Sequence, residues 1–322
     1  MKGLKKIALA TAVAAAPFAA QAELKAMNDS AMGNVTGQAG VTIELETKVS
    51  IGQFKYTDEG SFAVNDIVLG GAGVTTDGAV DTDGDGTADN TLLDQLKIDI
   101  DVAADGDAVI HVGSLEVDPT TGAPVPIDWG MTAGSMELIG NDATGDTTTL
   151  ISNMSMHGDL AALDMRVDTA TDHLNMVVAF DIDDMDFDVD FLGIGIRDMV
   201  VSGAGTNFDY DGNGQTADEE LAASGGTAAE GYDWSTDPTQ QLAFGKLTNY
   251  ANVNLDVYKG AGLGASTATN VLRVDVNNVY MDVNIGDIQI GGDIAAGTGQ
   301  SIGSVALDNL AITDTKLAIY GH

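Results

Sequence analysis

The sequence predicts an all-β fold: an elongated antiparallel β-architecture, either prism- or solenoid-like or built from stacked meander sheets, with a short N-terminal capping helix. Three observations predict it. Apolar and polar residues alternate with period two over long stretches, 40 glycines stand against 5 prolines, and Cys is absent. This alternation is typical of half-buried antiparallel strands. Without disulfides, the fold must depend on strand pairing and apolar burial.

The chain begins with the features of a secretory signal peptide. Residues 1–22 combine three lysines, an apolar run and the small-x-small sequence Ala20-Gln21-Ala22, which is the pattern of a cleavage site. The apolar run is too short for a membrane span, so we expect an exported chain without a transmembrane anchor. The expected divisions are 1–22 as signal peptide, 23–40 as N-terminal helix and cap, and 41–322 as a β-rich domain with long loops at 71–90 and 206–237.

Four segments show the alternation most clearly: residues 41–51, 96–102, 185–191 and 279–285. We expect one face of each strand to be buried and the other, rich in Asp and Asn, to be wet. Helical patterns are short and few, and we expect helices only within residues 27–35 and 216–223.

Short units that place two polar or Gly residues between two apolar ones interrupt the alternation. They are Val64-Asn-Asp-Ile67, Ile182-Asp-Asp-Met185, Ile196-Arg-Asp-Met199, Val276-Asn-Asn-Val279, Ile285-Gly-Asp-Ile288 and Leu307-Asp-Asn-Leu310. Two-residue hairpins are one interpretation, because Asn and Asp tolerate the positive φ of primed turns; Val274 would then face Met281. The other interpretation is a bulge or corner through which a long strand continues. Hairpins favour a meander, and corners favour a prism or solenoid.

The formal net charge of −36 makes nucleic acid an unfavourable partner, because it is a polyanion. A strongly acidic exported chain should instead attract cations, and calcium is the expected one. Two loops have suitable spacing, with oxygen ligands at alternate positions and Gly where the loop bends. Their candidate ligands are Asp81, Asp83, Asp85 and Asp89 in the first loop, and Asp209, Asp211, Asn213, Gln215 and Glu220 in the second.

The second loop matches the EF-hand pattern at its main ligand positions, including the final Glu220. The first loop has Leu92 at that final position and resembles the acidic calcium repeats of thrombospondin-like and dockerin-like proteins. The alternative for both is an acidic, Gly-rich turn that binds no ion.

Hydrolytic motifs are absent, since the sequence contains no HExxH, no GxSxG and no Cys nucleophile. The acidic run at 183–190 resembles a glycosidase carboxylate pair only superficially, because alternation places its carboxylates in a row on one strand face. We therefore expect a protein that is not an enzyme, with no catalytic or cofactor-binding residue.

The mature N-terminus carries a resemblance. It rests on Leu24, Met27, Met32 and Val35 near one face of a short helix, on Gly37-Gln-Ala-Gly40 before the first strand, and on Tyr56-Thr-Asp58-Glu-Gly60 and Asp66-Ile67-x-Leu69-Gly70-Gly71 further on. This block resembles the exported FilA-like family, described as pilus-assembly proteins of Gram-negative bacteria. The resemblance is best over residues 24–71 and implies a surface or pilus-associated role with no catalytic residue.

These observations predict a non-enzymatic, exported structural protein of the cell envelope, associated with a pilus or fimbria or acting as an adhesin. It would lie at the outer-membrane surface or outside the cell, with the periplasm as the alternative. Its partners would be further copies or other pilus and envelope proteins. Residues 317–320 are the candidate edge strand for self-assembly, and the simpler interpretation makes them a strand of the monomer's own sheet. The alternative functions are a carrier of an apolar or glycan ligand and, less expected, a polysaccharide-active enzyme.

Overall fold

The computed structural model describes residues 40–76, 90–117, 119, 124–141, 145–205, 249–292, 294 and 298–321. Most of these residues lie in strands, so the expected all-β antiparallel fold is confirmed. The strands are β1 (Val41–Thr47), β2 (Val49–Thr57), β3 (Ser61–Gly70), β4 (Leu93–Val102), β5 (Ala108–Ser114), β6 (Ile127–Ile139), β7 (Thr147–Asp168), β8 (His173–Phe180), β9 (Asp184–Val189), β10 (Ile194–Ser202), β11 (Ala251–Ala261), β12 (Thr269–Ile290) and β13 (Gln300–Ile319). Two short helices accompany them, α3 (Gly73–Thr76) and η1 (Asp190–Leu192). Within these described ranges no helix has the length and apolarity needed to span a membrane.

The described strands form one 13-stranded sheet. β7 pairs with β5 and β8 through its C-terminal part and with β6 and β9 through its N-terminal part. β12 pairs in turn with β11 and β10, and β13 follows β12. The sheet therefore has two halves that share β7, β12 and β13. The first half has the order β1-β4-β5-β7-β8-β11-β12-β13, and the second has the order β2-β3-β6-β7-β9-β10-β12-β13.

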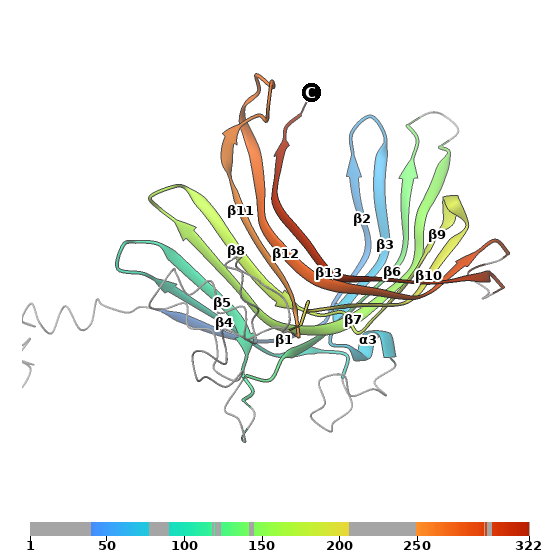
Figure 1. Ribbon diagram of the computed structural model, residues 1–322, viewed down its shortest axis with the longest axis horizontal. Coiled ribbons are helices and arrows are strands. Elements are labelled where there is room, and N and C mark those ends of the chain that lie inside the picture. The colour runs from blue at the N-terminus through green and yellow to red at the C-terminus, as the bar shows by residue number, and fades with distance from the viewer. Residues whose placement is uncertain are drawn as a thin grey trace, which may run out of the picture. The chain divides into compact units, whose positions relative to one another are not determined.

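The long shared strands bend where the two halves meet (Figure 1), so that β11 and β12 rise on one side and β2, β3 and β6 on the other. Two groups of buried apolar residues form the core. One surrounds Leu96, Val112 and Ile127, and the other surrounds Ile182, Val201 and Ala251.

Five of the six units that interrupt the alternation lie inside continuous strands and are here called bulges, so the hairpin interpretation is wrong. β12 runs unbroken through two of them and β13 through a third. Val274 pairs with Leu317 on β13 rather than with Met281, which pairs with Leu310. The unit at Ile182 lies in the short connection between β8 and β9, where Ile182 forms an isolated bridge with Val201.

In three of these units an Asp or Asn adopts a left-handed backbone. Asp66, Asp198 and Asn309 have φ values of 53°, 51° and 56°. Short polar side chains tolerate this conformation better than other non-Gly residues do. The register with β12 shifts at Asn309, whereas at Asp66 and Asp198 the strand and its neighbours are interrupted together without a register shift.

Glycines on neighbouring strands make room for two of these bulges. A Cβ at Gly134 would lie 3.2 Å from Asp66 Oδ2, and a Cβ at Gly286 would lie 2.8 Å from Asp198 Cβ. The bulges of adjacent strands therefore stack closely only because one member of each pair lacks a side chain.

Other expectations need correction or lie outside the described residues. The predicted strand 41–51 is two strands divided at Lys48, because β1 pairs with β4 in the first half and β2 with β3 in the second. The loop expected at 71–90 begins with α3. The helices expected within 27–35 and 216–223, nearly all of the cap at 23–40, and the loop at 206–237 lie outside the described residues. Leu317 and Ile319 pair with β12, so the simpler interpretation of the C-terminal segment is confirmed.

The bulge at Asp66 provides a test. Asp66 is exposed, and its left-handed φ would cost a β-branched residue about 1–2 kcal/mol. We expect Asp66→Val to lower the free energy of unfolding in urea by about this amount, about 1–2 kcal/mol, and Asp66→Asn to leave it near the wild-type value. Equal urea midpoints for the two variants would contradict this explanation of the bulge.

Candidate functional site

The residues expected to bind calcium lie outside the described residues. This holds for Asp81, Asp83, Asp85 and Asp89 in the first loop and for Asp209, Asp211, Asn213, Gln215 and Glu220 in the second. The described residues instead bring together two other features, an apolar face of the sheet and acidic clusters on its opposite face.

The first feature is a continuous apolar side of the sheet, here called the apolar face. Residues paired across an antiparallel sheet share one side, so the register defines rows. Three rows cross the first half: Ile43, Ile98, Val112, Leu163, Val178, Val253, Val279, Ile312; Val41, Ile100, Ile110, Met165, Met176, Leu255, Val276, Thr315; and Val102, Ala108, Val167, Leu174, Val257, Val274, Leu317. Every member except Thr315 is apolar.

The rows continue into the second half. They include Val49, Leu69, Met131, Met156, Met185; Phe54, Val64, Met136, Ile151; Val201, Val283, Leu307; and Met199, Ile285, Val305. β12 joins the two halves, because Val279 belongs to a row of the first half, whereas Val283 and Ile285 belong to rows of the second. The bulges keep these residues on one side as the strands bend.

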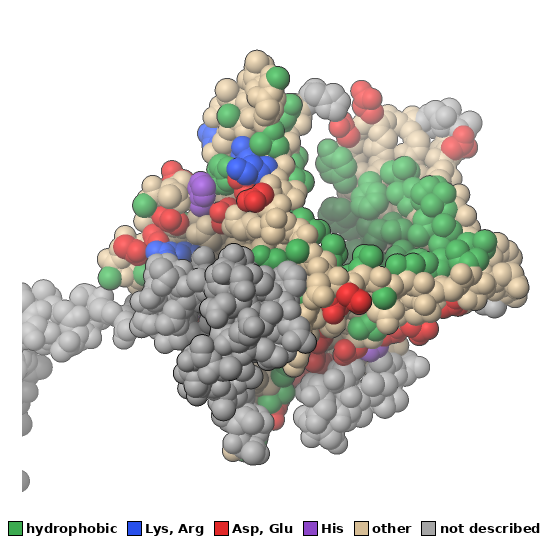
Figure 2. All heavy atoms as spheres, viewed as in Figure 1, with side chains coloured by type: hydrophobic (Ala, Val, Ile, Leu, Met, Phe, Trp, Pro, Cys, Tyr) green, Lys and Arg blue, Asp and Glu red, His purple; other side chains and the backbone are tan. Residues whose placement is uncertain are grey.

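The apolar face is more exposed than a sheet face of this composition should be. Exposure reaches 71% at Val102 and 54% at Phe54 and Ile319. Figure 2 shows apolar side chains gathered in the hollow between the two raised parts of the sheet. Contiguous exposed apolar surface of this kind marks interaction sites in soluble proteins. The expectation that the apolar face of each strand would be buried is therefore wrong for the edge strands β1, β2 and β13, whereas interior members of the rows such as Val112 and Val201 are buried.

The opposite side, here called the polar face, buries acids that the sequence predicts to be wet. Asp107, Asp164 and Asp188 are each 2% exposed. Arg166 Nε donates to Asp107 Oδ2 at 2.7 Å, and Thr169 donates to Asp107 through both its backbone N–H and its hydroxyl. The backbone and hydroxyl hydrogen bonds from Thr169, followed by the Arg166 bond, hold the pKa of Asp107 below its usual value.

Asp188 and Asp164 have partners of the same kind. Arg197 forms an ion pair with Asp188, and Asn153 Nδ2 donates to its other carboxylate oxygen at 2.9 Å. A 2.6 Å hydrogen bond joins His111 Nδ1 and Asp164 Oδ1. Burial raises the pKa of Asp164, and the His111 contact opposes that rise.

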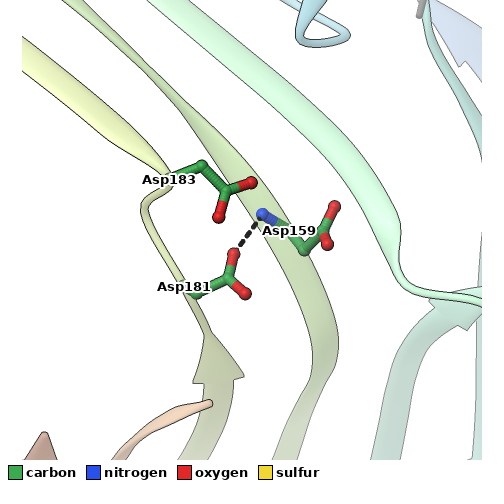
Figure 3. Close-up of side chains that lie close together, drawn as sticks. All are labelled: Asp159, Asp181 and Asp183. Atoms are coloured by element: carbon green, nitrogen blue, oxygen red, sulfur yellow. Dashed lines mark hydrogen bonds between the residues drawn. The ribbon is translucent and has the colours of Figure 1, made fainter. Parts of the chain in front are cut away.

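The second feature is a group of carboxylates at the junction of β7, β8 and β9 (Figure 3). Asp159 lies on β7, and Asp181 and Asp183 lie on the connection between β8 and β9. One ligand atom from each lies within 4.8 Å of the others. The backbone positions them closely. The Asp159 N–H donates to Asp181 Oδ1 at 2.6 Å, and the Asp181 N–H donates to the Asp159 carbonyl oxygen at 2.9 Å.

Gly158 allows this close approach, since a Cβ there would lie 2.4 Å from the Asp181 carbonyl oxygen. Burial raises the pKa of Asp181 to about 6, and the Asp183 charge adds to the rise. The neighbouring Tyr250 hydroxyl has a pKa raised first by burial and then by the charges of the three carboxylates. The group can hold a proton up to about pH 6, and three carboxylates are also the donor type of a hard cation site.

A second acidic group lies nearby on β9 and β10 and consists of Asp184, Asp186 and Asp198. The backbone N–H of Asp198 donates to Asp186 Oδ1 at 2.9 Å. Burial raises the pKa of Asp184, and the Asp186 charge raises it further. The alternation over 185–191 correctly indicated carboxylates in a row on one face of this strand, although Asp188 in that row is buried.

Sequence reasoning missed the group at Asp159 because its members come from strands whose pairing the sequence does not reveal. It also missed the exposure of the apolar face. One available signal for the exposed apolar face was the large number of segments with alternating apolar residues, each of which needs a cover for its apolar side.

The pKa of Asp181 predicts a pH effect on stability. The folded protein holds this proton more tightly than the unfolded chain, so the contribution is present below about pH 4 and is lost as the pH rises through about 6. Between pH 4 and pH 7, Asp181→Asn should gain about 1–2 kcal/mol of unfolding free energy relative to wild type, after allowance for solvent screening. Urea midpoints across this range provide the measurement. The same pH dependence in Asp181→Asn and in wild type would disprove the raised pKa.

Comparison with known proteins gives one family. Residues 1–104, about a third of the chain, match a family described as being of unknown function, DUF6160. No curated protein matches the chain, and no solved structure matches it. The matched part contains β1 to β4, which are the first strands of both halves of the sheet.

Proposed function

We propose that this chain is an exported carrier that holds a long apolar chain, such as an acyl chain, against the apolar face of its sheet. The exposure of that face carries the proposal. Leaving apolar surface in water costs about 25 cal/mol per Å², so an occupant that covers the rows gains free energy by displacing water. Of the functions expected from the sequence, the carrier is the one that uses this surface directly.

The curvature of the sheet favours a flexible chain over a second copy as the occupant. Two concave faces placed together would enclose a void, and close packing is what stabilises protein interfaces. The polar face of another copy does not fit the hollow either, because it carries the acids described above. An acyl chain can follow the bend and fill the hollow.

Two neighbouring residues of β13 test the proposal with matched changes. Ile312 ends a row on the apolar face and is 39% exposed. Thr313 is also exposed and lies on the other side. An added charge at residue 312 would have to be desolvated by the bound chain, so Ile312→Asp should weaken binding at least about tenfold, which corresponds to about 1.4 kcal/mol.

The measurement is a fluorescence titration with the uncharged probe N-phenyl-naphthylamine, together with its displacement by dodecanol. Thr313→Asp adds the same charge on the polar side and should bind like wild type. Equal losses in the two variants, or no saturable binding by the wild-type protein, would overturn the carrier proposal.

An assembling subunit of the cell envelope is the second candidate, and the edge of β13 favours it. β13 pairs with β12 along its length, and among the described residues no strand pairs with its other edge. Open edges accept strands from other chains. However, Asn309 and Asp314 have left-handed φ values on this strand, and bulges of this kind discourage edge pairing. The resemblance to the FilA-like family supports this candidate independently of the geometry.

Electron microscopy of the chain lacking residues 1–22 tests the assembling role together with calcium binding. A calcium-stabilised subunit should form filaments with calcium and none with a chelator. Asp209→Asn combined with Glu220→Gln, which removes two carboxylates from the EF-like loop, should abolish the filaments. Single particles in both conditions would exclude assembly as the main function.

A further inference from the structure

We propose that the bound chain carries an anionic head, the carboxylate of a single-chain fatty acid, and that Lys259 holds this head. The inference rests on the carrier function proposed above and deepens it by naming the class of ligand. The register of β11 is its starting point.

Lys259 occupies a position where the alternation of β11 calls for an apolar residue. Val253, Leu255 and Val257 precede it at two-residue intervals, and each belongs to a row of the apolar face. Lys259 pairs with Leu272, which pairs with Ile319. These three residues form a short fourth row at the end of the first half. Lys259 is the only charged residue in the rows traced here across the described strands.

The surroundings of Lys259 differ from those of the paired cations in the described part of the chain. Arg166, Arg197 and Arg273 each form an ion pair with an Asp on the polar face. Lys259 is exposed, and no described carboxylate lies within ion-pair distance of it. Its partners in the row are the apolar residues Leu272 and Ile319, which are 48% and 54% exposed.

The acids of the polar face do not cancel this local charge. Asp256 and Asp275 pair with each other on the opposite side of the sheet, and Arg273 Nη2 donates to Asp275 at 2.7 Å. More distant acids are screened at physiological salt, where the Debye length is about 8 Å. The end of the apolar face near Lys259 is therefore a place where an acyl chain can lie on apolar rows with its carboxylate beside an ammonium group.

Apolar side chains also follow one another along β11, across the rows, as such a ligand requires. From Lys259 back to Val253 the strand advances about 20 Å, at roughly 3.3 Å per residue, and the side chains of the apolar face along that path are uncharged. A ligand whose head lies at Lys259 can therefore place its tail along β11 and β12 toward the bend. A Lys that merely covers apolar surface with its own stem is the simpler alternative, and the experiment separates the two.

The test compares three amphiphiles of equal chain length by isothermal titration calorimetry: laurate, dodecanol and dodecyltrimethylammonium, each below its micelle concentration. Wild type should bind laurate about three- to fivefold more tightly than dodecanol, as expected for a partly exposed ion pair, and should bind the cation most weakly. Lys259→Glu should reverse this order.

The matched control is Lys316→Glu. Lys316 is an exposed residue of β13 that pairs with Asp275 on the polar face, so the variant makes the same change in net charge on the opposite side. It should keep the preference for laurate.

Equal effects of the two variants would show that net charge alone sets the preference, which would overturn the inference. Equal binding of laurate and dodecanol by wild type would also overturn it while leaving the carrier function intact. If none of the three amphiphiles binds, the proposed function fails, and the inference fails with it.

Discussion

This structure depends on the side of the sheet to which each strand residue points, since successive residues of a strand point to opposite sides. A regular strand keeps its apolar residues on one side only where apolar and polar residues alternate without interruption. In this sequence the alternation is interrupted repeatedly. Left-handed Asp and Asn residues such as Asp66, Asp198 and Asn309 stand at three of these interruptions, and their strands continue through them. As a result, one side of a long, bent sheet stays apolar from β1 to β13.

Both sides of this sheet depart in part from the burial that is usual for a sheet with one polar side. Ordinarily the apolar side is covered and the acids are wet. Here the polar side buries acids such as Asp107 and Asp188 under arginines, while large apolar residues such as Phe54 and Val102 remain exposed. The arginine and threonine partners allow these carboxylates to be buried, because a buried carboxylate needs hydrogen bonds or a counter-charge. On the apolar side residues such as Val112 are buried in the core, but residues of the edge strands such as Phe54 stay exposed, and this exposed part directs attention to an external occupant.

Charge separates the two sides in a way that bears on function. The described ion pairs of arginine lie on the polar face, where the acids of a chain with net charge −36 are concentrated. The apolar face is almost free of charge and carries Lys259 at one end. An acidic exterior keeps such a chain soluble and discourages indiscriminate association of its copies, which matters for a protein that exposes so much apolar surface.

The sequence alone determined the fold class, the polar and apolar sides of the strands and the positions at which the alternation is interrupted, because each of these depends on the local order of side chains. It correctly indicated the row of acids along β9. It left open whether Val276-Asn-Asn-Val279 turns the chain or lets it continue, since Asn permits both. Only the tertiary structure decided that the strands form one bent sheet, that Asp159 meets Asp181 and Asp183, and that the apolar side is left exposed. Those outcomes depend on which distant strands pair, and pairing is set by the combined packing of the whole sheet rather than by any local pattern.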